Sequence, residues 1–142
     1  MTISMFIGEF FWLSNFYPVP VIVDRIKFNS TEHAYQMFKT DDLDWRKQIK
    51  NAKTPGQSKR LGAKCPMRKD WDNVKVDVMR KCIRAKFTQN EDLKEKLLAT
   101  GDQKLEEGNT WGDTFWGTVN GHGKNMLGRV LMEIREELRT NQ

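Results

Sequence analysis

The sequence has few residues that could form disulfides or bind a metal, and it has no long hydrophobic run. Its only cysteines, Cys65 and Cys82, are too few for a disulfide scaffold, and with the two histidines they do not show the spacing of a zinc site. The longest apolar run, residues 19–23, is interrupted by Pro20 and falls far short of the roughly 18 residues of a membrane span. Residues 1–5 lack the basic and apolar regions of a signal peptide. We therefore expect a reduced, cytoplasmic protein with no metal, no cofactor and no membrane partner.

The apolar residues that are present suffice for one folded domain. They include 8 Phe, 5 Trp and 7 Met, too many large apolar groups for a disordered chain. The 142 residues correspond to one domain at about 100–200 residues per domain. Since no repeat, low-complexity tract or linker is visible, we expect residues 1–142 to form a single domain.

The chain carries an excess of positive charge. It has 24 Lys and Arg against 19 Asp and Glu, and the basic residues are concentrated between residues 47 and 86. Such an excess suits a phosphate-bearing partner. The alternative is a set of solvated helix faces, and charge alone leaves both interpretations open.

Local signals predict several helices and few strands. Asn29 with Glu32 three residues later has the pattern of a capping box, Thr54 precedes Pro55 as an N-cap precedes an N1 proline, and Asp70 is a further N-cap. The helices are expected over residues 30–39, 42–50, 55–62, 71–87, 91–99 and 126–138.

The expected strands are short. Residues 21–23 and 26–28 predict a hairpin around Asp24 and Arg25, and residues 104–107 predict one more strand. Residues 108–124 are rich in glycine and aromatic residues and are expected to be irregular. The fold class is therefore α+β and mainly helical.

The strongest candidate for chemistry is the segment 31–39. A helix turns by about 100° per residue, so Glu32 and Lys39 lie within about 20° of each other and Gln36 about 40° from Glu32. This face presents a carboxylate, an amide and an amine, while the opposite face goes to the core. The core face comprises Ala34, Met37 and Phe38. The alternative is an ordinary exposed polar face.

A second candidate is the segment 111–117, in which glycines and indoles bracket Asp113. Glycines let a ligand approach the backbone, and an indole stacked on a nucleobase contributes about 1–3 kcal/mol. The alternative is a turn-rich aromatic mini-core. Residues 120–128 form a glycine-rich turn before the last helix, which could hold a phosphate or simply join two elements.

The order of these motifs resembles the NADAR, or YbiA-like, family. The resemblance covers residues 6–139. Its motifs are residues 13–18, 31–36, Lys39, Lys86-Phe87, 97–101, 105–107, Asp113, 116–117 and 125–135. It implies a compact, mainly helical α+β domain with short strands, and hydrolysis of N-glycosidic bonds in phosphorylated ribosides. Some members act on ribosylamino-pyrimidine intermediates linked to riboflavin synthesis, and others remove ADP-ribose from guanine in DNA.

The resemblance also implies roles for individual residues. Lys39 matches the family lysine that takes C1 of the ribose as a Schiff base, which requires a lowered pKa. Because an ionised Glu32 would raise that pKa, Glu32 is better suited to shuttle protons, with Asp113 as a second acid. We expect His33 to be structural and hydrogen-bonded to the loop at residues 14–15. The expected ligand-binding residues are Trp12, Ser14, Asn15, Phe16, Gln36, Trp111, Trp116, Gly117 and Asn125.

Three functions remain open from the sequence. The first is an N-glycosidase that removes ADP-ribose from a nucleobase, with single-stranded DNA carrying ADP-ribosylated guanine as partner. The second is an N-glycosidase of riboflavin-pathway phosphoribosyl intermediates. The third is a non-catalytic module that binds nucleic acid or ADP-ribose, which would not need Lys39, Glu32 and Asp113 on one wall.

Overall fold

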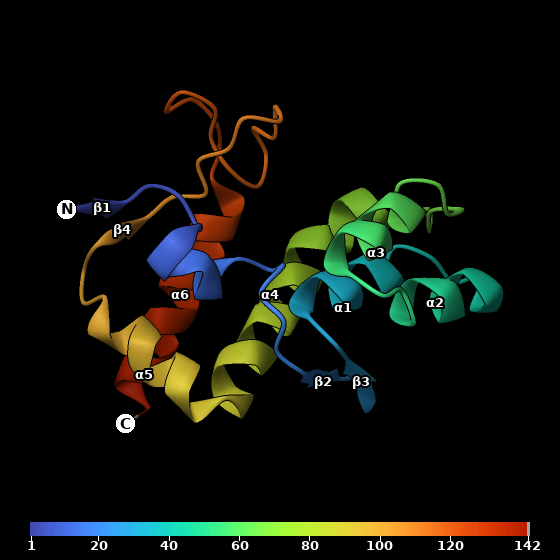
Figure 1. The fold of residues 1–142 in the computed structure, drawn as a ribbon, viewed down its shortest axis with the longest axis horizontal. Coiled ribbons are helices and arrows are strands. Elements are labelled where there is room, and N and C mark those ends of the chain that lie inside the picture. Colours follow the sequence, from blue (N-terminus) through green and yellow to red (C-terminus); the bar gives the residue numbers. More distant parts are fainter. Residues whose placement is uncertain (142) are drawn as a thin grey trace. The chain divides into compact units, whose positions relative to one another are not determined.

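The computed structural model describes residues 1–141, which contain six α-helices, one 3₁₀ helix and four short strands (Figure 1). The expected class, α+β and mainly helical with short strands, is confirmed. The chain divides into two compact units: a middle unit of residues 15–89, and a terminal unit of residues 1–14 with those from Asn90 onward. Within residues 1–141, none of the helices combines the length and apolar character that a membrane crossing requires.

The middle unit begins with a hairpin. Strand β2 (Val21–Val23) pairs antiparallel with β3 (Ile26–Phe28), as predicted. Asp24 and Arg25 have φ angles of 51° and 69°, which is the geometry of a two-residue hairpin turn. The alternation of the strands buries Val21 and Phe28, which are register partners.

Four helices complete the middle unit: α1 (Thr31–Met37), α2 (Leu43–Lys50), α3 (Pro55–Gly62) and α4 (Trp71–Gln89). Asp42 caps α2 by accepting from the backbone N–H of Trp45 (3.0 Å). Thr54 caps α3 in the same way. These helices confirm the predictions to within two residues. Helix α1 contacts α2, α3, α4 and both strands, so it is enclosed on several sides.

The two ends of α1 differ from the prediction. Its N-cap is Ser30, whose Oγ accepts from the backbone N–H of His33 (3.2 Å), so the expected capping box of Asn29 and Glu32 is wrong. The His33 ring also binds Ser30, and this buried contact fixes the cap one residue later than the sequence indicates. The helix ends at Met37, and Lys39 lies beyond it in a tighter turn. The backbone N–H of Lys39 donates to the carbonyl of Gln36 (3.2 Å).

The terminal unit contains β1 (Thr2–Ile3), a 3₁₀ helix η1 (Gly8–Leu13), α5 (Glu91–Ala99), β4 (Lys104–Leu105) and α6 (Met126–Thr140). Strand β1, which the sequence did not predict, pairs in parallel with β4. Helices α5 and α6 pack together (Figure 1). The predicted apolar stripe of α6 is buried, and it comprises Leu127, Val130, Leu131, Ile134 and Leu138.

The segment between β4 and α6 is irregular, as expected. Its backbone is held by single contacts, such as the N–H of Asn109 donating to the carbonyl of Thr118 (2.8 Å). Val119 and His122 bond to each other across a turn in which Asn120 and Gly121 have positive φ angles.

Candidate active site

Every residue of α1 is buried, including its polar ones. Glu32 is 6% exposed, Gln36 3% and His33 1%. The predicted core face is confirmed. The alternative interpretation of an ordinary exposed polar face is wrong for Glu32 and Gln36, because the neighbouring helices also cover these side chains. A buried polar group costs free energy unless it is hydrogen-bonded, so the partners of these side chains decide what they can do.

Glu32 and Gln36 form a buried pair one helical turn apart. Nε2 of Gln36 donates to Oε2 of Glu32 at 2.5 Å. Oε1 of Gln36 has no hydrogen-bond partner. On the facing helix, Gly62 leaves room for this amide, since a Cβ at that position would collide with Oε1 of Gln36.

Asn15 attaches the preceding loop to the start of α1. Its carbonyl accepts from the backbone N–H of Glu32 (3.1 Å) and from Oγ1 of Thr31 (3.2 Å). Its side-chain Nδ2 donates to Sδ of Met79 (3.3 Å), while Oδ1 is buried without a hydrogen-bond partner. Unsatisfied buried groups of this kind cost about 1–3 kcal/mol each. A ligand donor that reached Oδ1 of Asn15 or Oε1 of Gln36 would recover part of that cost.

Lys39 is half-buried at the C-terminal end of α1. Its Nζ lies 5.7 Å from the centroid of the Tyr35 ring, which packs on Trp71 at 5.2 Å between centroids. Burial lowers the pKa of the Lys39 amine, while the carboxylate of Glu32 raises it. The sequence predicted that Lys39 and Glu32 share a helix, whereas Lys39 lies in the turn after α1. From this turn the Lys39 amine still interacts electrostatically with the Glu32 carboxylate.

Three further residues act on the Lys39 amine. Cys65 raises its pKa, and the ammonium groups of Lys59 and Lys75 lower it. Sequence reasoning missed all three as site residues. Lys59 and Lys75 belong to the basic residues between residues 47 and 86, but their spacing in the sequence does not predict an interaction with Lys39.

His33 is structural, as expected, but its partners are not the predicted ones. Oγ of Ser30 donates to Nδ1 (2.7 Å), and Nε2 donates to the carbonyl of Ala52 (2.9 Å). Burial lowers the pKa of His33, so its neutral form is favoured. The expected bond to the loop at residues 14–15 is therefore wrong, because both ring nitrogens have other partners.

Asp113, the predicted second acid, lies in the terminal unit and holds a turn. Its Oδ1 accepts from the backbone N–H groups of Phe115 (3.1 Å) and Trp116 (2.9 Å). Asn109 binds both the carbonyl and the N–H of Asp113 through its side chain. One carboxylate oxygen of Asp113 is thus used by the fold, and its catalytic role stays a prediction.

Two of the predicted ligand residues in the terminal unit, Asn125 and Gly117, lie against the backbone of neighbouring segments. Asn125 donates through Nδ2 to the carbonyl of Leu105 (2.9 Å) and accepts through Oδ1 from the N–H of Glu107 (3.0 Å). A Cβ on Gly117 would collide with the carbonyl of Glu107. Contacts with the backbone of Glu107 therefore explain why an asparagine stands at position 125 and a glycine at position 117.

The glycine-rich turn before α6 does not offer its helix amides to a phosphate. The N–H of Met126 donates to the carbonyl of Phe115 (3.0 Å), and that of Leu127 to the carbonyl of Trp116 (2.9 Å). These amides are already satisfied by the preceding loop.

The aromatic candidates differ in exposure. Trp12 is buried in η1, Trp116 is half-buried with its ring 4.9 Å from that of Phe115, and Trp111 is 61% exposed. Ser14, at the end of η1, is half-buried. Phe16, in the middle unit, lies 5.8 Å from Nζ of Lys59.

The middle unit therefore brings together part of the predicted site. It contains Asn15, Phe16, Glu32, Gln36 and Lys39. The terminal unit contains Trp12, Ser14, Trp111, Asp113, Trp116, Gly117 and Asn125. The amine–carboxylate pair lies wholly within the middle unit.

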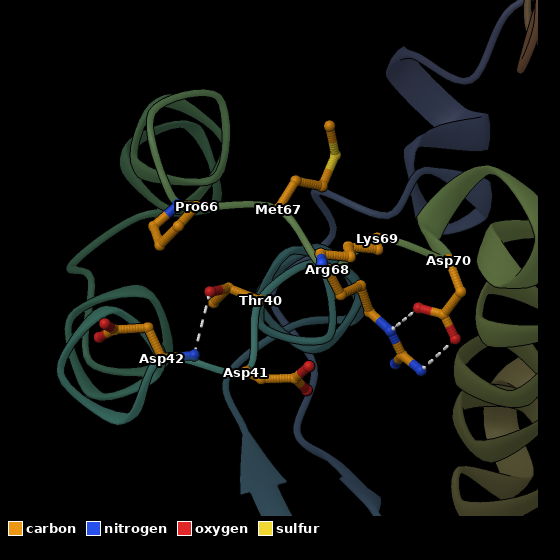
Figure 2. Close-up of a pocket in the computed structure, with 8 residues that line it drawn as sticks. All are labelled: Thr40, Asp41, Asp42, Pro66, Met67, Arg68, Lys69 and Asp70. Atoms are coloured by element: carbon orange, nitrogen blue, oxygen red, sulfur yellow. Dashed lines mark hydrogen bonds and ion pairs between the residues drawn. The ribbon is translucent and has the colours of Figure 1, made fainter.

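A pocket of about 540 Å³ lies beside the Lys39 turn, between residues 40–42 and 66–70 (Figure 2). Arg68 donates from its backbone N–H to the carbonyl of Lys39 (2.8 Å) and binds Asp70 through two side-chain bonds, of 2.6 and 2.9 Å. None of the predicted site residues lines this pocket. Among residues 1–141, no cluster of three or more His, Cys, Asp and Glu side chains could hold a metal ion.

The sequence and the fold match a known family. A model of the NADAR domain matches residues 5–139. The chain belongs to the NADAR domain family. It is 44% identical over 134 residues to N-glycosidase YbiA of Shigella boydii, covering 92% of this chain and 81% of that protein.

Two further similarities support this assignment. The solution NMR structure of the Escherichia coli protein YbiA matches with a TM-score of 0.88 and 38% identity, over 99% of this chain and 85% of that one. The riboflavin biosynthesis protein VVA0006 of Vibrio vulnificus is 43% identical over 130 residues, 89% of this chain. The chain spans only 35% of the length of VVA0006.

Proposed function

We propose that this N-glycosidase releases a nucleobase from a phosphorylated riboside, and that its substrate is ADP-ribosylated guanine in single-stranded DNA. The observation that carries the proposal is the half-buried Lys39 amine, whose pKa is lowered by burial, beside the buried carboxylate of Glu32. A lysine becomes a nucleophile when its neutral form is accessible near pH 7. The relatives named N-glycosidase YbiA support the reaction class.

The chemistry divides into two steps. The neutral Lys39 amine forms a bond to C1 of the ribose as the C1–N bond to the base breaks, and the electron pair of that bond leaves with the base. The Glu32 carboxylate accepts the proton that the new Lys39 adduct loses and passes a proton to the departing base. Ring opening gives an imine, which water hydrolyses to free Lys39 and return the sugar as an aldehyde that recloses.

A second candidate substrate is a ribosylamino-pyrimidine phosphate. It is favoured by the relatives named riboflavin biosynthesis protein, from Vibrio vulnificus and, at 34% identity, from Zea mays. The bond to be broken is again an N-glycosidic bond at C1 of a phosphorylated ribose. The same Lys39 and Glu32 chemistry therefore serves either substrate.

The decisive experiment measures base release from three substrates. The purified protein is incubated with single-stranded DNA carrying ADP-ribosylated guanine, with a free ADP-ribosyl nucleobase, and with the pyrimidine riboside phosphate. We expect the fastest release from the DNA substrate. Faster release from the pyrimidine riboside would select the second candidate, while salt-sensitive DNA binding without any release would indicate a binding module.

Trapping tests the role of Lys39 directly. Borohydride should reduce the imine to a stable amine, which adds the mass of the sugar fragment to the peptide containing Lys39. Lys39→Arg keeps the charge but cannot form the imine, so turnover and trapping should both be lost. Lys64→Arg, at an exposed position, is the matched control and should behave like the unmodified protein. Retention of most activity by Lys39→Arg would instead mean direct attack by water.

A further inference from the structure

Residues 45–69 form a segment without acidic residues. The segment contains nine Lys and Arg and no Asp or Glu, whereas the rest of the chain has 15 Lys and Arg against 19 Asp and Glu. It includes most of α2, all of α3 and the turns that follow them, and it lies within the middle unit. Helices α2 and α3 pack on each other and on α1 (Figure 1). The positive excess of the chain therefore comes from this one region, which we call the basic segment.

On other helices, basic side chains have acidic partners on the same helix. Arg80 pairs with Asp77 (2.6 Å) on α4, and Arg139 pairs with Glu136 (2.8 Å) on α6. Such pairing is typical of a solvated helix face, which carries both signs of charge. The basic segment contains no acidic residue that could form such a pair within it.

The acidic partners of the basic segment lie outside it, near its two ends. Arg46 lies 3.6 Å from Asp41, and Arg68 lies 2.6 Å from Asp70. Three exposed lysines of the segment have no ion-pair partner within residues 1–141: Lys47, Lys53 and Lys64. Their charges are therefore available to an anion from outside the protein.

An aromatic ring adjoins the basic segment at α3. A Cβ on Gly56 would meet Nη1 of Arg60 at 3.8 Å and Cε2 of Phe16 at 3.9 Å. The ring of Phe16 and the guanidinium of Arg60 therefore lie against the same glycine, which has no side chain to separate them. Phe16 is half-buried and Arg60 is exposed. An aromatic face with cations around it is the combination on which proteins stack unpaired nucleobases.

The basic segment and Phe16 both adjoin the candidate active site. Arg68 donates from its backbone N–H to the carbonyl of Lys39 (2.8 Å). Phe16 follows Asn15, whose carbonyl accepts from the backbone N–H of Glu32 (3.1 Å). The charged surface and the candidate active site therefore belong to one unit and are joined through the backbone.

We propose that the basic segment and Phe16 bind the single strand of DNA that flanks the ADP-ribosylated guanine. This inference rests on the proposed function and names the surface that recognises its polymeric substrate. The lysines and Arg60 bind phosphodiester oxygens, and the counterions that the strand releases make the affinity dependent on salt. The ring of Phe16 stacks on an unpaired base of the strand.

Two observations favour a single strand over other polyanions. In a duplex the bases are stacked and paired, so neither the Phe16 ring nor the half-buried Lys39 amine could reach one. A helix that lies on a membrane presents an apolar face to the lipid. The exposed residues of α3 are all polar: Gln57, Lys59 and Arg60.

Neutralising charges in two places tests this surface. One variant removes three exposed charges from the basic segment: Lys47→Gln, Lys53→Gln and Arg60→Gln. The control variant removes three exposed charges from the terminal unit: Lys96→Gln, Lys104→Gln and Arg129→Gln. Both variants lose the same net charge, so a difference between them depends on where the charges lie.

Fluorescence anisotropy with an unmodified single-stranded oligodeoxynucleotide measures binding. For the basic-segment variant we expect Kd to rise at least about tenfold, and the slope of log Kd against log salt concentration to fall by about 2, because each lost phosphate contact on a single strand removes about 0.7. The control variant should bind as tightly as the unmodified protein. Equal losses in the two variants, or no loss in either, would overturn the proposal.

A second variant tests the stacking. Phe16→Leu keeps an apolar side chain but loses the aromatic face, so Kd for the oligonucleotide should rise about fivefold or more. Phe11→Leu, at a partly exposed position in the terminal unit, is the matched control and should leave Kd unchanged. Unchanged binding by Phe16→Leu would overturn the role of Phe16.

Base release separates this proposal from the proposed function. With the DNA substrate, kcat/KM of the basic-segment variant should fall by the same factor as its affinity, while release from a free ADP-ribosyl nucleobase should be unchanged. If the unmodified protein releases no base from any substrate, the proposed function fails, and the anisotropy results alone decide on the surface. Binding to vesicles of phosphatidylserine and phosphatidylcholine without binding to the oligonucleotide would overturn the proposal in favour of a membrane.

Discussion

Gln36 holds the carboxylate of Glu32 from one helical turn away, through a 2.5 Å bond from Nε2 to Oε2 in the interior of the middle unit. The bond fixes one oxygen of Glu32, and the charge of this carboxylate raises the pKa of the Lys39 amine. Because Oε1 of Gln36 has no hydrogen-bond partner, the fold tolerates an unsatisfied acceptor at this point. Such a cost is expected where a side chain is retained for function rather than for stability.

The first prediction concerns this bond. Gln36→Ala removes the donor from a buried carboxylate, so we expect kcat to fall at least about tenfold and the free energy of unfolding to fall by about 1–3 kcal/mol. Gln48→Ala, at an exposed position on α2, is the control and should leave both quantities unchanged. Urea unfolding and base-release assays measure the two effects. Normal turnover in Gln36→Ala would show that Glu32 needs no positioning.

The second prediction concerns the two glycines of α3. A Cβ on Gly62 would collide with the Gln36 amide, whereas a Cβ on Gly56 would meet its nearest atom, Nη1 of Arg60, at an ordinary 3.8 Å. Alanine is a better helix former than glycine by about 1 kcal/mol, so propensity alone favours both changes. We expect Gly62→Ala to destabilise the protein by about 1–3 kcal/mol and to lower kcat, while Gly56→Ala is neutral or stabilising. Equal urea midpoints for the two variants would contradict the close packing at Gly62.

The local parts of the fold could be predicted from the sequence because their signals lie within a few residues. Asp42 and Thr54 cap their helices through their own neighbours, and the Asp24-Arg25 turn closes its hairpin. Strand β1 could not be predicted, because it has two residues and its partner β4 lies about a hundred residues later. The N-cap of α1 was misplaced because a buried contact with His33 selects Ser30.

The sequence predicted which residues belong to the candidate site, but it did not predict that they are buried. The sequence indicates that Glu32, Gln36 and Lys39 belong together. In the structure Gln36 binds Glu32, and the charge of Glu32 acts on the Lys39 amine. Their burial depends on helices from distant parts of the chain, which helical periodicity cannot reveal. The contributions of Lys59 and Lys75 depend in the same way on how α3 and α4 pack on α1.

The third prediction concerns the pH dependence of turnover. The groups that act on the Lys39 amine are Glu32 on α1, Lys59 on α3, Cys65 after α3 and Lys75 on α4. Only the neutral amine attacks, so kcat/KM should rise with pH through the lowered pKa of Lys39. Removing the Lys59 charge with Lys59→Gln removes a repulsion, raises that pKa and should move the rising limb to higher pH. The profile is measured from base release by both proteins over the same pH range, and an unmoved limb would mean that another group controls it.

The last prediction concerns Lys86, a fully buried lysine on α4 whose Nζ lies 5.7 Å from the Tyr17 ring. Burial lowers the pKa of Lys86 from 10.5 to about 7. Below pH 7 the amine is charged in both the folded and the unfolded states, and the folded state bears the full cost of burying that charge. Between about pH 7 and 10.5 the unfolded chain binds the extra proton, so stability should rise with pH by up to about 1.4 kcal/mol per unit.

Lys86→Met keeps the apolar stem without the amine and should remove this rise, which urea midpoints at pH 6.5, 8 and 9.5 would measure. Parallel pH profiles for the two proteins would show that Lys86 keeps its charge in the folded state.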